Sequence, residues 1–532
     1  MGVHVVWFKR DMRVADHAPL REAAAAGRVL PLYIFEPSLV HQPESDPSHW
    51  EFVRGSLAEL SERLRRAGTP LAVRIGEPPG CFEQLADELR PFGGIERLWS
   101  HEETGNRLTY DRDRRVAAWV NRRGIPWTQR PQHGVVRGLN DRDGWAARWA
   151  KRMRGDPLPP PAQLNGLPPR GFDFGRIPTL NDLGLPACSK PDAQRPGEAE
   201  AHRTLDSFLD VRGQNYRQDM ASPVTAMGGC SRLSPHIAYG TISMRAVHAA
   251  ARERVDELNR ADPGKRSPLW LASLRSFQSR LRWHCHFMQK LEDEPGIEHR
   301  NMNRAYDGLR TEDPADWTEK ERLKFEAWCA GRTGYPLVDA CMRCLHAGGW
   351  INFRMRAMLV SFASYHLWLH WRPTAVYLAR QFIDFEPGIH FSQFQMQSGT
   401  TGINSVRIYS PIKQAKDNDP SGLFIRRWVP ELTAVPTECI AEPHKHFGTE
   451  PGTLFVPGDS VAQKLGAPYP PPIVDHKRAY AEAKRRIFER RGKASTRREA
   501  QRVYFKHGSR KRPGQSAGRH DDDRGGAVER SA

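Results

Sequence analysis

The sequence predicts an N-terminal α/β domain built on a doubly wound parallel sheet, followed by an all-α C-terminal domain. Short apolar runs alternate with helical segments over the first 150 residues, which is the pattern of such a sheet. This strand pattern disappears after about residue 200. Between these parts, ten of the 42 prolines fall in residues 157–196, as in a connector that follows the protein surface. We therefore divide the chain into ranges 1–150, 151–200, 201–475 and 476–532.

The N-terminal range predicts four strands that are buried on both faces, because runs of four to eight apolar residues suit such strands. The expected strands are 4–8, 28–35, 71–75 and 95–99, and the expected helices are 18–26, 52–66, 82–89 and 110–122. Parallel sheets bind ligands beyond the carboxyl ends of their strands, but this range has no G-x-G-x-x-G motif.

The range after residue 200 predicts helices, because its apolar residues recur at three- and four-residue spacing. The expected helices are 247–258, 269–291, 319–329, 337–347, 351–371 and 375–382. No apolar run reaches the 18–20 residues of a membrane span. Basic residues follow the first apolar run at once, unlike a secretory signal, so we expect a cytoplasmic protein without membrane contact.

The formal net charge of +18 is concentrated near the C-terminus. Residues 477–512 hold 15 Lys and Arg against three Asp and Glu. A basic tail of this kind is typical of nucleic-acid binding. The alternative is a solvated tail that aids solubility.

The eight cysteines show no disulfide framework of a secreted domain. Cys341 and Cys344 form a CxxC inside a helical pattern without a second pair, which argues against zinc. An iron–sulphur cluster needs four placed thiolates, and the sequence leaves open whether Cys439 joins this pair.

Two segments carry candidate site residues. In the segment from Cys230 to Pro235, Ser234 is a natural N-cap and Pro235 suits the first helical position, which favours an anion-binding turn or an ordinary capped helix. Arg354 and Arg356 lie two apart on a predicted helix and so face different sides. They need carboxylate partners if buried, and Asp384 and Glu386 are available. The alternative is a pair of surface salt bridges.

These segments belong to a series that resembles the photolyase/cryptochrome flavoprotein family. The series is Trp7–Arg13, Ser231–Pro235, Thr333–Ala340, Gly349-Trp350 and Phe424–Leu432, in the family's order and near its spacing. The resemblance covers roughly residues 3–435. It implies an α/β antenna-type domain, a long connector and a helical FAD-binding domain.

The resemblance also implies the positions that contact FAD. They are Tyr216, Cys230, Ser231, Arg232, Leu233, Ser234, Phe277, Arg354, Arg356, Asp384, Phe385 and Glu386. Cys230 stands in place of the family's usual threonine, and Glu386 in place of a common aspartate. An arginine–carboxylate arrangement at the flavin ring would stabilise the anionic reduced form.

For the DNA lesion, the resemblance implies that Trp283 stacks on a flipped-out base, with Phe394 as a second aromatic and Gln414 as a DNA contact. Photolyases are among the handled cases of base flipping. Arg280 and Phe353 replace a glutamate and an asparagine that face the lesion in many members. His390 is the nearest polar residue to the position of the family's asparagine beside the flavin.

Histidines offer a second chemistry, because repair of a (6-4) photoproduct requires a proton donor. His284, His286 and His390 are the candidates, and the alternative is that they are structural.

The electron-supply chain departs from the family's tryptophan triad. Ser392 aligns with the flavin-proximal member, Trp371 with the middle one, and Trp317 lies one residue from the outer position. We expect photoreduction to use another aromatic, such as Trp350, Trp368 or Tyr365.

The leading hypothesis is light-driven repair of ultraviolet-damaged DNA by a monomeric deoxyribodipyrimidine photolyase, with a cyclobutane dimer or a (6-4) photoproduct as substrate. The alternatives are a cryptochrome-like photoreceptor and a flavin-free DNA-binding module. A second antenna chromophore of folate or deazaflavin type would lie near residues 101–106, unless these form a surface loop.

Overall fold

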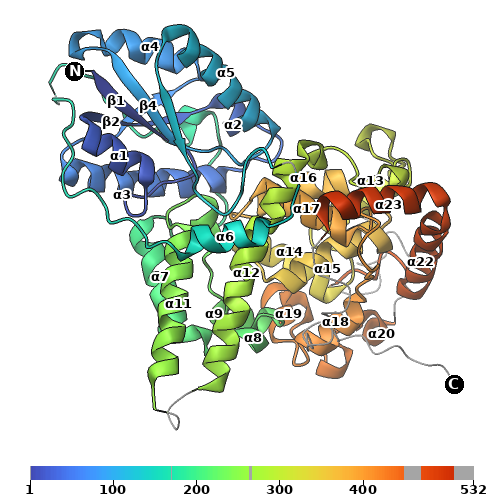
Figure 1. The fold of residues 1–532 in the computed structure, drawn as a ribbon. Helices are drawn as coiled ribbons and strands as arrows, with labels where there is room; N and C mark the ends of the chain where they lie inside the picture. Colours follow the sequence, from blue (N-terminus) through green and yellow to red (C-terminus); the bar gives the residue numbers. More distant parts are fainter. Residues whose placement is uncertain (1, 140, 169, 263–266, 449–468, 509–532) are drawn as a thin grey trace.

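The computed structural model describes residues 2–139, 141–168, 170–262, 267–448 and 469–508. An α/β domain precedes a larger helical domain, and the connector runs between them (Figure 1). This confirms the predicted fold class.

A five-stranded parallel sheet forms the N-terminal domain, in the order β3-β2-β1-β4-β5. The strands are β1 (Val3–Phe8), β2 (Arg28–Phe35), β3 (Ala72–Ile75), β4 (Ile95–His101) and β5 (Trp127–Arg130). Every residue of β1 is buried, as the unbroken apolar run predicts. The sequence missed β5, a four-residue edge strand that is only half-buried.

Helices cover both faces of this sheet. The helices are α1 (Ala18–Ala26), α2 (Pro37–Val40), α3 (Pro47–Ala67), α4 (Gly80–Glu88) and α5 (Arg107–Arg123), with the 3₁₀ turn η1 (Arg90–Phe92). Val6 and Phe8 of β1 pack in one core with α1 and α3, whereas Val5 and Trp7 pack in another with α4 and α5. This alternation follows from the two-residue period of a strand.

The connector is fixed along the sheet domain. The amide of Leu164 donates to Ala67 O at 2.6 Å, and that of Val73 donates to Phe174 O at 2.8 Å. Helix α6 (Trp145–Arg154) runs through the boundary predicted at residue 150, and η2 (Asn181–Leu183) follows.

The helical domain surrounds a large apolar core. Its elements before residue 330 are α7 (Glu198–Asp210), η3 (Arg212–Asn215), α8 (Tyr216–Asp219), α9 (Pro223–Gly229), α10 (Ser234–Ala238), α11 (Met244–Arg260), α12 (Pro268–Asp293), η5 (Pro295–Glu298), η6 (Arg304–Tyr306), η7 (Pro314–Asp316) and α13 (Glu319–Cys329). After it come α14 (Pro336–Gly348), α15 (Phe353–Ser361), η8 (Phe362–His366), α16 (Trp371–Gln381), α17 (Pro387–Gln397), α18 (Pro411–Asn418), α19 (Leu423–Trp428), η9 (Pro430–Leu432), η10 (Thr437–Cys439) and α20 (Pro443–Phe447).

One predicted helix is interrupted. Residues 351–371 contain α15, then the π-helical turn η8, and then a break in which Trp368 has a φ of +59°. The single-helix prediction was wrong because side chains on all sides of this segment are buried, so the apolar pattern continues through the break.

The region expected to be a tail is folded as far as residue 508. Helices α22 (His476–Gly492) and α23 (Ala494–His507) pack on the helical domain through Ala483, Ile487 and Val503. Residues 509–532 of the predicted tail lie outside the described residues. In the part of the chain that the structure describes, we find no helix both long and apolar enough to span a membrane.

Candidate functional site

An arginine–carboxylate pair lies at the centre of the predicted site. Arg356 of α15 donates from Nη1 to Asp384 Oδ1 at 2.9 Å and from Nη2 to Asp384 Oδ2 at 2.8 Å. Burial raises the pKa of Asp384, but the charge and hydrogen bonds of Arg356 outweigh it and hold that pKa below its usual value. The two-pronged geometry makes this a fixed ion pair.

The turn before α10 joins this pair in an unexpected way. Ser234 is the first helical residue and Leu233 holds the capping position, so the prediction of Ser234 as N-cap was wrong. The Ser234 hydroxyl instead accepts from Trp350 Nε1 at 3.1 Å and hydrogen-bonds to Asp384. A tertiary partner has therefore taken the oxygen that a cap would use.

Arg232 in the same turn has a left-handed backbone with φ of +61°. Its guanidinium lies 4.0 Å from the centre of the Trp350 ring, and burial lowers its pKa to about 10. Burial raises the pKa of the Cys230 thiol to about 12, so Cys230 stays protonated at neutral pH. Leu233 is buried, and the Ser231 carbonyl accepts from Arg212 at 3.3 Å.

Tyr216 and Phe277 form one wall of the site region. Both are buried, with ring centres 6.0 Å apart in an edge-to-face arrangement. The exposed Arg280 hydrogen-bonds to the Tyr216 hydroxyl. Arg280, predicted to contact DNA, is thus held at the surface by a residue predicted to contact FAD.

The N-terminal domain supplies a partner that sequence reasoning missed. Arg10 lies 3.3 Å from Glu386 Oε2 and donates to the carbonyl of the buried Phe385 at 2.6 Å. Burial raises the pKa of Glu386 despite the nearby charge of Arg10. The only available signal was that Arg10 follows β1 in the Trp7–Arg13 motif, at the strand end where parallel sheets place functional residues.

Aromatic side chains surround His390 on α17. Its ring centre lies 4.5 Å from that of Phe394 and 5.2 Å from that of Phe385. His390 Nε2 donates to Ala375 O at 2.8 Å, and burial lowers its pKa to about 3. At neutral pH this imidazole is uncharged and already engaged, which favours a packing role over proton donation. Burial also lowers the pKa of His284 to about 4.

Two of the predicted DNA contacts lie on the surface and one does not. The exposed fractions are 39% for Trp283 and 49% for Phe353. Gln414 is buried and accepts from Asn418 Nδ2 at 3.2 Å. The expectation that Gln414 lies at the rim was therefore wrong, because its side chain turns back along α18.

The candidate electron donors differ in their electrostatic surroundings. Trp371 is fully buried and donates from Nε1 to Asn301 Oδ1 at 2.8 Å. Trp350 lies under Arg232, and Trp368 lies between Arg310 at 4.6 Å and Arg486 at 4.9 Å. A cation against a ring opposes loss of an electron from that ring. The structure thus favours Trp371 over Trp350 and Trp368.

Four buried polar atoms test whether the site fits a flavin. Within the described residues they have no hydrogen-bond partner, and they are Asn352 Oδ1, Arg354 Nε, His284 Nδ1 and Glu386 Oε1. Such atoms cost about 1–3 kcal/mol each when left unsatisfied. The isoalloxazine edge offers both donors and acceptors, so these residues fit a flavin.

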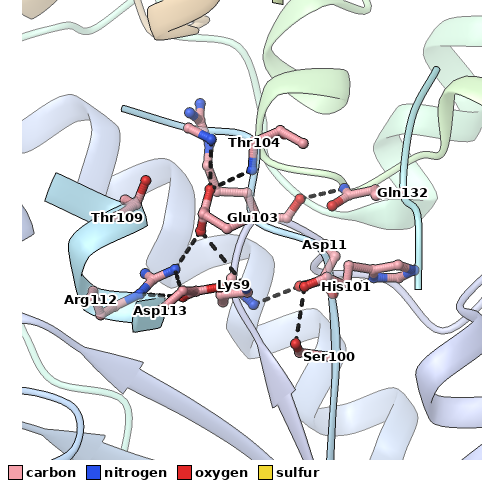
Figure 2. Close-up of polar contacts among 12 residues, drawn as sticks. Lys9, Asp11, Ser100, His101, Glu103, Thr104, Thr109, Arg112, Asp113 and Gln132 are labelled. Carbon is pink, nitrogen blue, oxygen red and sulfur yellow. Dashed lines mark hydrogen bonds and ion pairs between the residues drawn. The ribbon is translucent and has the colours of Figure 1, made fainter. Parts of the chain in front are cut away.

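A buried ion-pair network lies at the carboxyl ends of β1 and β4 (Figure 2). Arg112 binds Glu36, Glu103 and Asp113, and Lys9 lies 3.0 Å from Asp113. Glu103 also accepts from the amides of residues 104 and 105. The segment 101–106 is therefore not a surface loop, and protein partners engage its carboxylate.

Next to this network, Asp11 accepts hydrogen bonds from two buried histidines. Asp11 Oδ2 lies 3.0 Å from His17 Nε2 and 2.6 Å from His101 Nδ1. This is the one group at metal-ligand spacing among the described residues. His17 Nδ1 accepts from the amide of Leu20, however, which places the ring proton on Nε2. Hydrogen bonds, and not a metal, therefore account for the cluster.

The cysteines do not gather into a cluster within the described residues. All eight are free, with Cys341 and Cys344 buried inside α14. Cys344 Sγ lies 3.9 Å from Trp350 O.

Comparison with known proteins agrees with this geometry. The family model described as "DNA photolyase" matches residues 4–139, and the one described as "FAD binding domain of DNA photolyase" matches residues 277–489. These two matches cover the sheet domain and most of the helical domain.

Three similar proteins illustrate the range of relatives. A deoxyribodipyrimidine photo-lyase of Thermus thermophilus is 30% identical, over 81% of this chain and 93% of its own. A cryptochrome DASH of Gloeobacter violaceus is 29% identical, over 88% and 93%. The crystal structure of a class III photolyase from Agrobacterium tumefaciens superimposes with a TM-score of 0.76 at 26% identity, covering 93% of this chain and 98% of that one.

A parallel-sheet domain joined to a helical flavin-type domain is the architecture of the light-dependent flavoproteins of DNA repair and signalling. The chain belongs to the photolyase/cryptochrome family.

Proposed function

We propose that the chain is a photolyase that binds FAD and repairs a pyrimidine lesion flipped out of ultraviolet-damaged DNA. The observation that carries this proposal is Trp283, whose ring is 39% exposed on α12. Stacking on a base stabilises its extruded position by about 1–3 kcal/mol. Trp283 is itself supported by Phe287, whose ring centre lies 5.6 Å away and nearly parallel.

The residues that would hold FAD are Arg356 and Asp384 at the flavin ring and the segment from Cys230 to Ser234 along the rest of the molecule. Excited reduced flavin supplies the electron for repair. The chain's own contribution is electrostatic, because the Arg356 guanidinium offsets negative charge next to it. The buried aromatics Phe385 and Phe394 keep water away from this region.

The test is a repair assay with the reduced protein under blue light. Oligonucleotides containing either a cyclobutane dimer or a (6-4) photoproduct are incubated separately, and restored pyrimidines are counted. We expect conversion of the cyclobutane dimer, because His284 and His390 are neutral at physiological pH and poorly suited to donate the proton that (6-4) repair requires. Conversion of neither lesion would reject the proposal.

A cryptochrome-like photoreceptor is the second candidate. Arg280 favours it, since this side chain stands where many dimer photolyases have a glutamate and is engaged with Tyr216. Flavin photoreduction without conversion of either lesion would support this candidate.

Cytoplasmic location, a monomeric state and a second chromophore of folate or deazaflavin type stay predictions. For the chromophore, segment 101–106 is the expected contact, although Glu103 already binds Arg112 and two backbone amides.

A further inference from the structure

Helix α23 lies beyond residue 489, where the match to the FAD-binding family model ends. One side of it is anchored, with Thr496, Val503 and His507 buried against the helical domain. Arg502 donates to Met302 O at 2.5 Å. The helix is thus a fixed part of the molecule, and its outward face has a constant orientation.

The anchor joins α23 to the end of the helix that carries Trp283. Glu294, which ends α12, lies 2.7 Å from His507 Nε2, 3.3 Å from Lys506 Nζ and 3.7 Å from Arg502 Nη1. Burial raises the pKa of Glu294, but its bond to His507 and the neighbouring charges outweigh this and lower the pKa to about 2. The carboxylate therefore stays charged and holds α23 in place.

A single face of α12 leads from Trp283 to this anchor. Trp283, His286, Lys290 and Glu294 follow one another at spacings of three and four residues, so they share one side of the helix. The His507 charge reaches His286 and that of Lys290 reaches His507. The eleven residues from Trp283 to Glu294 span about 16 Å at the helical rise.

The outward face of α23 has the composition of a nucleic-acid contact. Its exposed side chains are Arg497, Arg498, Gln501, Tyr504 and Phe505. Spacings of three, four and seven residues place them on one side. The helix's single acidic residue, Glu499, is half-buried and pairs with Arg502 at 3.0 Å. On α22, by contrast, Arg485 and Arg486 are both bound to Glu482.

We propose that α23 binds the duplex on one side of the flipped lesion, with Arg497 and Arg498 contacting phosphates and Phe505 packing against the sugar edge. This rests on the proposed function in taking DNA as the substrate. A span of about 16 Å corresponds to about five base-pair steps at 3.4 Å each. The contact therefore falls within the flanking duplex and carries no sequence preference.

The experiment measures the affinity of the full-length protein for labelled duplexes, with and without a central dimer, as a function of salt. Each phosphate contact contributes about 0.9 to the slope of log K against log salt. The double variant Arg497→Ala/Arg498→Ala should reduce that slope by about 1.8 on damaged and undamaged DNA alike. Lys477→Ala/Arg478→Ala removes two charges from α22 and should leave the slope within a few tenths of wild type.

Flank length gives a second readout. Shortening the duplex to three base pairs beside the lesion should weaken wild-type binding and leave the Arg497→Ala/Arg498→Ala variant unchanged, since its contact is already lost. Phe505→Ala, which removes a 70% exposed ring and little packing, should weaken binding only to the long duplex. Equal slopes for both double variants, or equal sensitivity to flank length, would overturn the proposal.

These results are separable from the proposed function. If wild-type protein shows no preference for damaged DNA, repair is in doubt, but the salt slope on undamaged duplex still decides whether α23 binds DNA.

Discussion

Arginines organise the site at the scale of single residues. Arg356 fixes Asp384, Arg10 engages Glu386 across the domain boundary, and Arg232 covers Trp350. Each guanidinium meets a carboxylate or an aromatic face, the two partners that suit its planar charge. Trp283 differs from these buried groups because it presents its ring to solvent, and its role can be tested alone.

Replacing Trp283 with Ala should weaken binding of dimer-containing duplex by about 1–3 kcal/mol, or about five- to 150-fold, because one stacking surface is lost. Binding of undamaged duplex should stay within twofold. Fluorescence anisotropy with both duplexes measures the difference. Tyr480→Ala is the matched control, since Tyr480 is similarly exposed at 37% but lies on α22. An equal loss on both duplexes would remove Trp283 from lesion recognition.

The sequence identified one partner of this site and missed another for a physical reason. Arg356 and Asp384 are 28 residues apart, in segments that share one resemblance. Arg10 and Phe385 are 375 residues apart, in different domains, and only their docking shows the contact. Gln414 was misplaced because a helix position does not say which way a side chain turns.

Elements show how far apolar pattern determines structure. The prediction of 28–35 as a strand and 18–26 as a helix matches β2 and α1 at both ends. The same method failed at 351–371, where complete burial hides the break between α15 and α16. That break matters because it separates Trp368, held between two arginines, from Trp371, which begins α16.

Trp371→Phe should slow photoreduction of bound flavin at least tenfold, because it removes the buried indole that is free of a stacked guanidinium among the described tryptophan candidates Trp350, Trp368 and Trp371. Trp350→Phe and Trp368→Phe should change the rate less than twofold. Flavin absorbance during blue illumination with an external reductant gives the rates. A slow Trp368→Phe variant beside a normal Trp371→Phe variant would contradict the proposed route.

At the scale of the whole molecule, buried neutral histidines link stability to pH. Burial lowers the pKa of His101 to about 3, and those of His49 and His284 to about 4. In the unfolded chain these groups titrate near pH 6.5. The unfolded state therefore binds more protons between these values, and stability falls as pH falls.

The melting temperature should accordingly stay nearly constant from pH 8 to 7 and decrease steadily from about pH 6.5 to 4.5. Each such histidine contributes up to about 1.4 kcal/mol per pH unit over this window. Differential scanning fluorimetry at fixed ionic strength measures the trend. A melting temperature that is unchanged between pH 7 and 5 would contradict it.

Flavin content of the purified chain, compared between two matched variants, tests the account most directly. Asp384→Asn removes the carboxylate partner of Arg356, whereas Glu431→Gln removes that of Arg343, another two-pronged pair in the helical domain, with distances of 2.9 and 2.8 Å. We predict close to one FAD per wild-type or Glu431→Gln chain and at least a tenfold loss for Asp384→Asn. A colourless wild-type protein that takes up no FAD, or full flavin content in Asp384→Asn, would contradict the assignment of this site.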